Sequence, residues 1–191
     1  MYSVNFAEIE KLQHEGKWDK LTEIMISAAK NVQRGGADFL VICTNTMHKM
    51  ADEIERNVGI PVLHIADATA QSIKGEKINR VGLLGTKFTM EQDFYKGRIF
   101  EKYGIEVIIP DEQERQMVHD IIYNELVHGV IKASSRNTYL QVISNLANKG
   151  AQGIVLGCTE IPLLVNQQDC EVKLFDTTAI HALAAVELAL K

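Results

Sequence analysis

The feature that most constrains the fold of this chain is a short block that occurs twice. An apolar run ends in a Cys-Thr pair at Val41–Thr46 (VICTNT) and again at Val155–Glu160 (VLGCTE). A Gly-Ala pair precedes each run, at Gly36 and at Gly150. Each copy indicates a helix that ends at glycine, a buried strand and a polar loop that starts at a thiol. Two copies in 191 residues predict two related α/β halves.

Strands and helices are predicted to alternate along the chain, which is typical of parallel α/β proteins. A second block, Asp-x-Thr-Ala, also occurs twice, at Asp67–Ala70 and Asp176–Ala179, and both aspartates are predicted N-caps. The predicted helices cover residues 18–33, 46–57, 67 onward, 90–103, 111–127, 136–149 and 176 onward. The predicted strands cover residues 39–43, 62–65, 80–86, 105–110, 155–157 and 172–175. Before them, residues 3–6 are predicted to be a short extended piece, followed by a helix-compatible stretch to about residue 16.

The second half has a strand, Val81–Thr86, that has no counterpart before Ser3 in the first half. If the two halves are true repeats, the first half lacks its opening strand and helix. We therefore expect a first domain that is truncated at its N-terminus.

Composition and charge exclude several classes of function. The net charge is −5 and no basic run occurs, which argues against binding to nucleic acid or anionic membranes. No apolar segment approaches the roughly 20 residues that span a bilayer, and residues 1–6 lack signal-peptide features. We expect a cytoplasmic protein. Three cysteines without a C-x-x-C motif predict neither a disulfide framework nor a zinc site.

The repeated thiols indicate proton-transfer chemistry. Loops at the carboxyl ends of parallel strands are where such folds bind ligands. Two thiols on opposite sides of one ligand can remove a proton from one face of a carbon and return it to the other. We expect Cys43 and Cys158 to alternate as base and acid. A single cysteine at the end of a strand is more often a core residue, and only the duplication with threonine favours catalysis. Cys170 carries no such signal.

Three segments, Cys43–His48, Gly157–Pro162 and Phe175–His181, resemble the aspartate/glutamate racemase superfamily. They are most similar to its aspartate racemase-like and broad-specificity amino-acid racemase members. The resemblance implies two pseudo-symmetric α/β domains, with the last strand and helix packed on the first. It also implies a homodimer with a small-molecule amino-acid substrate, and neither pyridoxal phosphate nor metal. Family members begin with a strand and a Gly-Gly-Met-Ser loop, which this chain lacks. The expected domains are residues 1–78 with 172–191, and residues 79–171.

The candidate substrate-binding residues lie mostly beside the two cysteines. Asn45, Thr46 and Thr159 are expected to cradle the α-carboxylate of the substrate. The resemblance gives a binding role to the residues that follow each cysteine. Glu160 stands where the glutamate racemase branch has histidine, so it either steers specificity or is a first-turn acid favoured by the helix dipole. The full set is Thr44, Asn45, Thr46, Thr86, Thr159 and Glu160, with Gln13 and Arg136 as weaker candidates.

The sequence predicts a cofactor-independent racemase of aspartate or of a broader range of amino acids, working through two cysteines. An inactive or ligand-binding remnant of the family is one alternative, because the N-terminal block is missing. A relative of hydantoin racemase or maleate isomerase is another. Thr44, Asn45 and Thr159 could also act as helix caps, and His48 and His181 as structural histidines.

Overall fold

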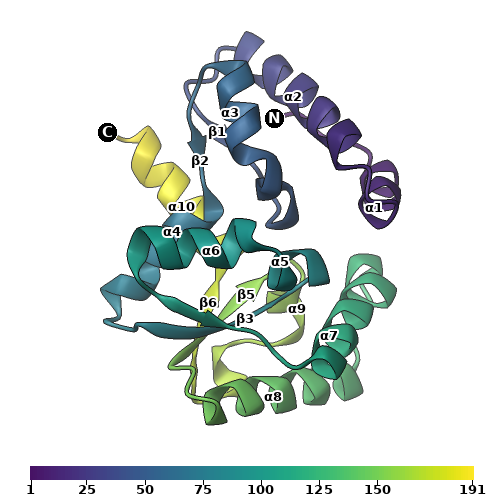
Figure 1. Cartoon of the computed structure of the whole chain (residues 1–191), viewed down its shortest axis with the longest axis vertical. Helices are drawn as coiled ribbons and strands as arrows, with labels where there is room; N and C mark the ends of the chain where they lie inside the picture. The colour runs from purple at the N-terminus through teal and green to yellow at the C-terminus, as the bar shows by residue number, and fades with distance from the viewer. The chain divides into compact units, whose positions relative to one another are not determined.

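The computed structural model describes all residues from Met1 to Lys191 and is an α/β protein with two parallel sheets (Figure 1). Its internal contacts divide it into two compact units. The first unit contains Met1–Ile42 and Lys49–His64, and the second contains Cys43–His48 and Ile65–Lys191. The first Cys-Thr block therefore belongs to the second unit.

The first unit is a small arrangement of helices with one pair of short strands. Strands β1 and β2 are parallel, with Leu40 opposite Val62. Helix α2 packs against α1 and α3, and Gly59 ends α3 in the left-handed conformation, with a φ of +77°. The elements are α1 (Phe6–His14), α2 (Trp18–Arg34), β1 (Leu40–Val41), α3 (Ala51–Val58) and β2 (Val62–Leu63).

The second unit is built on a four-stranded parallel sheet in the order β4-β3-β5-β6. The strands are β3 (Arg80–Gly85), β4 (Glu106–Ile108), β5 (Gly153–Gly157) and β6 (Lys173–Asp176). The β3 strand pairs with β5 over five residues and ends with Gly85 opposite Gly157. The β5 strand pairs with β6 up to Leu156 opposite Asp176. Three strands therefore end at nearly the same level.

Helices cover both faces of this sheet, with α4 and α6 on one side and α8 on the other (Figure 1). Helix α8 packs closely against the sheet at Gly82 of β3. A Cβ atom on Gly82 would lie 2.9 Å from Cδ1 of Leu146, which belongs to α8. The α-helices are α4 (Ile65–Gly75), α5 (Lys87–Glu91), α6 (Asp93–Tyr103), α7 (Glu112–Asn124), α8 (Ala133–Asn148), α9 (Ile161–Leu164) and α10 (Thr177–Ala189). Three 3₁₀ turns are η1 (Thr46–Met50), η2 (Leu126–His128) and η3 (Gln167–Asp169).

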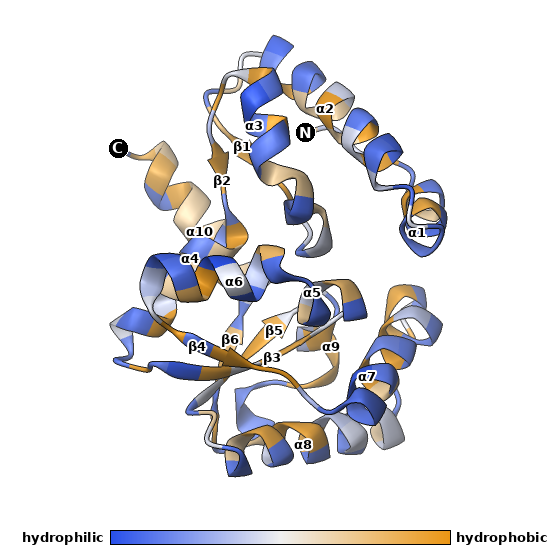
Figure 2. Cartoon of the chain, in the orientation of Figure 1, coloured by the Kyte–Doolittle hydropathy of each residue, from blue (hydrophilic) through white to orange (hydrophobic).

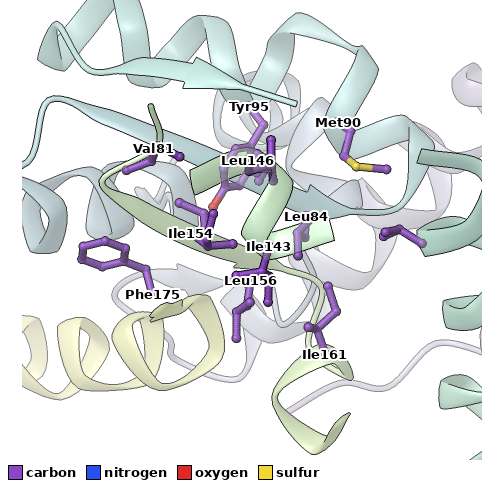
Figure 3. Packing of buried hydrophobic residues seen from close by; sticks show 14 of the residues in the cluster. Val81, Leu84, Met90, Tyr95, Ile143, Leu146, Ile154, Leu156, Ile161 and Phe175 are labelled. Atoms are coloured by element: carbon purple, nitrogen blue, oxygen red, sulfur yellow. The ribbon is translucent and has the colours of Figure 1, made fainter. Parts of the chain in front are cut away.

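The hydrophobic core lies between this sheet and its helices (Figure 3). The central strands are almost wholly apolar, as their colouring in Figure 2 shows. Tyr95 and Tyr139 are fully buried, and the Tyr139 hydroxyl donates a hydrogen bond to the carbonyl of Val118. This packed core gives the carboxyl ends of the strands a rigid base.

Several predicted elements differ from the structure in detail. The predicted helix over 46–57 begins as the 3₁₀ turn η1 and becomes α-helical only from Ala51. Asn5 is extended, as predicted, but the helix α1 already begins at Phe6, within the piece predicted to be extended. Asp67 is not an N-cap, because α4 begins at Ile65. Its carboxylate instead accepts two hydrogen bonds from Arg98, at 2.6 and 2.7 Å. Asp176 does cap α10 and accepts from the Thr178 and Ala179 amides.

The expected domain boundaries, 1–78 with 172–191 and 79–171, stay a prediction. The final helix α10 packs against α4, which the sequence placed in the first domain. The final strand β6 pairs instead with β5, within the sheet expected for the second domain. None of the helices is both long and apolar enough to cross a membrane.

Candidate functional site

Three parallel strands bring three polar residues to one edge of the sheet. Gly85 lies opposite Gly157, and Leu156 lies opposite Asp176. The next residues along the chain are Thr86 after β3, Cys158 after β5 and Thr177 after β6. Neighbouring strands are about 4.8 Å apart, so the ends of β3 and β6 are separated by roughly two such spacings, with Cys158 between them.

The first Cys-Thr block lies at the same edge of the sheet. The Thr46 hydroxyl is 3.1 Å from the Thr86 hydroxyl, beside the end of β3. Asn45 Nδ2 donates a hydrogen bond of 3.0 Å to Thr177 Oγ1, beside the end of β6. The segment Cys43–His48 is thus anchored on both sides of the strand that carries Cys158. The two repeated blocks meet at one edge of one sheet.

A cluster of three threonine hydroxyls, Thr46, Thr86 and Thr89, forms the β3 side of this edge. Thr89 Oγ1 lies 3.3 Å from both Thr46 Oγ1 and Thr86 Oγ1. All three side chains are buried, and Thr86 caps α5 by accepting from the Thr89 amide. Hydroxyl hydrogens rotate, so these groups can turn their donors toward a carboxylate.

Cys158 is a half-buried thiol that faces a carboxylate. Its Sγ donates to Glu160 Oε2 at 3.0 Å, and Glu160 precedes the short helix α9. Burial and the negative charge of Glu160 raise the pKa of the Cys158 thiol well above its usual value. Tyr139, whose pKa is also well above the usual value, is buried near both groups. At neutral pH, Cys158 is therefore a protonated thiol and can serve as an acid.

Cys43 is exposed at the start of the other block, and none of the three cysteines forms a disulfide. The loop after it is fixed by His48. The ring Nδ1 of His48 is 2.7 Å from the carbonyl of Thr44, and the Ile65 amide donates to Nε2 at 3.2 Å. Because Nε2 accepts, Nδ1 carries the hydrogen, and the ring is the neutral tautomer. The ring of His181 packs edge-on at 5.6 Å. His48 thus has a structural role here.

The three remaining candidate residues lie in different surroundings. Thr159 lies half-buried between Cys158 and Glu160. Arg136 Nε donates to the carbonyl of Leu164 at 2.7 Å, so this side chain supports the end of α9. Gln13 is buried on α1 in the first unit. A role for Arg136 or Gln13 in substrate binding stays a prediction.

Two residues of this edge were not among the sequence-based candidates, Thr89 and Thr177. Thr89 could have been found as the residue three places after an N-cap threonine, where cap geometry brings it back toward Thr86. Thr177 follows a strand, as Thr86 does, but sequence alone does not show that it reaches Asn45. No group of three or more His, Cys, Asp or Glu side chains is arranged to hold a metal ion.

Fold and site together define a class: a parallel α/β protein with two Cys-Thr loops and a hydroxyl cluster at the carboxyl edge of one sheet. The sequence profile of the Asp/Glu/Hydantoin racemase family matches residues 1–185. The chain belongs to this family.

Known proteins of the family share both sequence and fold with this chain. It is 55% identical to a candidate Asp/Glu racemase from Yersinia pestis, with a TM-score of 0.91, covering 100% of this chain and 83% of that one. An aspartate racemase homologue from Pyrococcus horikoshii OT3 is 37% identical, with a TM-score of 0.84, covering 100% of this chain and 82% of that one. The broad specificity amino-acid racemase RacX of Bacillus subtilis is 24% identical over 88% of this chain and 72% of its own length. The predicted α/β fold with parallel sheets and the predicted family are confirmed.

Proposed function

We propose that this chain racemises an amino acid, aspartate-like or of broader range, by moving the α-proton between two cysteines without a cofactor. The observation that carries the proposal is the meeting of both Cys-Thr blocks at one sheet edge, through Asn45–Thr177 and Thr46–Thr86. The names of the relatives, an aspartate racemase homologue and a broad specificity amino-acid racemase, support the substrate class.

The proton transfer uses the difference between the two thiols. The Cys43 thiolate takes the α-hydrogen as a proton, and the electron pair of the C–H bond stays on the carbon. The Cys158 thiol, held protonated beside Glu160, delivers its proton to the opposite face. The enzyme is left with a thiol at Cys43 and a thiolate at Cys158. This form takes the opposite enantiomer, so the cycle balances in both directions.

The α-proton of an amino acid is weakly acidic, so the negative charge that develops must be stabilised by donors placed in advance. The hydroxyl cluster of Thr46, Thr86 and Thr89 is suited to this task. Its three oxygens lie within 3.1 to 3.3 Å of one another and are shielded from water. A carboxylate at this cluster would receive charge-assisted hydrogen bonds, which are stronger than those between neutral groups.

The test is a racemisation assay with a panel of D- and L-amino acids, including both enantiomers of aspartate. The intact chain is expected to convert one enantiomer to the other, and Cys43→Ser and Cys158→Ser are each expected to lose conversion by at least about a thousandfold. The variant Cys170→Ser is the matched control and is expected to keep full activity. Binding of amino acids without conversion would favour a ligand-binding remnant instead. Undiminished conversion by either active-cysteine variant would contradict the mechanism.

A further inference from the structure

We propose that Thr177 is a positioning residue: its hydroxyl fixes the Asn45 side-chain amide in one orientation. This orientation leaves Asn45 Oδ1 as a hydrogen-bond acceptor without a donor from the protein. Both side chains are buried, with exposed fractions of 0% for Thr177 and 2% for Asn45. They come from the loop after β1 and from the start of α10, which are far apart in the sequence.

The orientation follows from counting hydrogens. A threonine hydroxyl has one hydrogen to donate. Thr177 Oγ1 lies 2.8 Å from the carbonyl oxygen of Leu156, which can only accept. The single hydrogen of Thr177 is therefore used on Leu156. Toward Asn45, Thr177 can offer only a lone pair, and the amide must present its NH₂ group, as the 3.0 Å contact from Nδ2 shows.

The other end of the amide has no partner inside the protein. Asn45 Oδ1 is buried and accepts no hydrogen bond. Buried acceptors are nearly always satisfied, so an exception calls for a donor that arrives from outside. Asn45 lies two residues after Cys43, and Thr177 binds the carbonyl of the residue two before Cys158. The unsatisfied acceptor therefore lies at the sheet edge where the two Cys-Thr blocks meet.

This inference rests on the proposed function for the identity of the ligand, an amino acid whose ammonium group supplies the missing donor. Without the Thr177 hydroxyl, the amide can turn over and present NH₂ to that ammonium group. In the unsubstituted protein, the orientation set by Thr177 therefore allows the site to distinguish a ligand that carries an amine from one that does not.

The first arm of the test needs no turnover. The side-chain amide of Asn45 is observed by ¹⁵N NMR in the 191-residue protein and is assigned by its loss in Asn45→Asp. In the intact protein its NH₂ signals are expected to exchange slowly with solvent. Thr177→Val, which keeps the shape and removes the hydroxyl, should shift these signals and speed their exchange at least tenfold. Thr177→Ser should leave them in place. An unchanged signal in Thr177→Val overturns the inference, whether or not the chain is a racemase.

The second arm uses binding and kinetics. Aspartate and succinate, which differ by the amine, are the probes. Thr177→Val is expected to weaken aspartate binding about tenfold and succinate binding less than threefold, with KM raised and kcat kept within threefold. Thr177→Ser should restore the intact values, and Thr178→Val, the same change at the exposed neighbour, should have no effect. Equal weakening of both ligands overturns the inference. Absence of racemisation by the intact protein counts against the proposed function alone, because the NMR arm still decides the role of Thr177.

Discussion

At the scale of single residues, the pair formed by Cys158 and Glu160 distinguishes the two thiols of the site. A repeated Cys-Thr motif suggests equivalent cysteines, yet in the structure Cys158 is half-buried beside the carboxylate of Glu160, whereas Cys43 is exposed. The two interpretations of Glu160 from sequence were a specificity residue and a first-turn acid. The contact with Sγ adds a third role, which is to keep Cys158 protonated.

Replacing Glu160 with Gln is expected to make Cys158 more reactive toward iodoacetamide. The thiolate reacts, and Glu160 raises the thiol pKa, so fewer thiolates exist at a given pH in the intact protein. Removing the negative charge lowers the pKa, and alkylation should begin at lower pH and proceed about tenfold faster at pH 8. Peptide mass spectrometry measures the rate, with Cys43 in the same sample as the reference. Slower alkylation of Cys158 in the variant would refute this role of Glu160.

Replacing Thr89 with Val removes one hydroxyl from the cluster without changing its volume. If the cluster binds the substrate carboxylate, the loss of one charge-assisted hydrogen bond costs about 1.5–3 kcal/mol, or roughly tenfold to a hundredfold in KM. Thr89→Ser keeps the hydroxyl and is expected to stay close to the intact enzyme. Steady-state kinetics with the preferred amino acid decides between them. An unaltered KM for Thr89→Val would mean that the carboxylate binds elsewhere.

At the scale of elements, close contact between β3 and β5 determines where the site residues lie. Gly85 and Gly157 are opposite each other at the ends of these strands, immediately before Thr86 and Cys158. A Cβ atom on Gly85 would lie 2.8 Å from the carbonyl oxygen of Gly157. Glycine at this position therefore allows the two strands to approach closely.

The change Gly85→Ala is expected to force the two strand ends apart and to destabilise the protein by about 1–3 kcal/mol. Gly75, the last residue of α4, is the matched control, because a Cβ atom there meets nothing within 4 Å. Gly75→Ala should be neutral or stabilising by up to about 1 kcal/mol. Urea denaturation monitored by circular dichroism measures both values. Equal stabilities of the two variants would show that the contact at Gly85 can relax.

Asp176 supplies a second element-scale prediction. Its carboxylate accepts from two amides at the start of α10, at 2.9 and 3.2 Å. Asp176→Ala is expected to cost about 1 kcal/mol in the free energy of unfolding. Glu187→Ala, at an exposed position of the same helix, is the control and should change little. A loss of the same size in both variants would argue against a specific cap.

Several helices and strands could be predicted from the sequence, whereas the side-chain contacts between distant elements could not. Apolar residues at helical spacing predicted α2, and continuous apolar runs predicted β3 and β5, which are buried on both faces. The repeated Asp-x-Thr-Ala blocks predicted two identical caps, but only Asp176 is one. Asp67 is held by Arg98, 31 positions away in the sequence. Likewise, Asn45 and Thr177 meet across 132 positions. Such pairs depend on tertiary packing, which local patterns do not encode.

At the scale of the whole molecule, the chain combines a small first unit with a larger second unit that holds both Cys-Thr loops. The two copies of the Cys-Thr motif therefore do not lie one in each compact unit; both lie in the second unit. The loop Cys43–His48 is fixed to the second sheet by the hydrogen bonds of Asn45 and Thr46. This arrangement supports the proposal that both thiols act on one substrate.

The central claim, that two thiols act on opposite faces of one carbon, is tested most directly by isotope incorporation during the first turnovers in deuterated water. The intact protein is incubated with one enantiomer of its preferred amino acid, and substrate and product are separated and weighed by mass spectrometry. Because one thiol removes the hydrogen and the other, already exchanged with solvent, supplies a deuteron, the product should carry one deuterium and the recovered substrate none. Product that retains the original hydrogen, or substrate and product that gain deuterium equally from the start, would contradict the account.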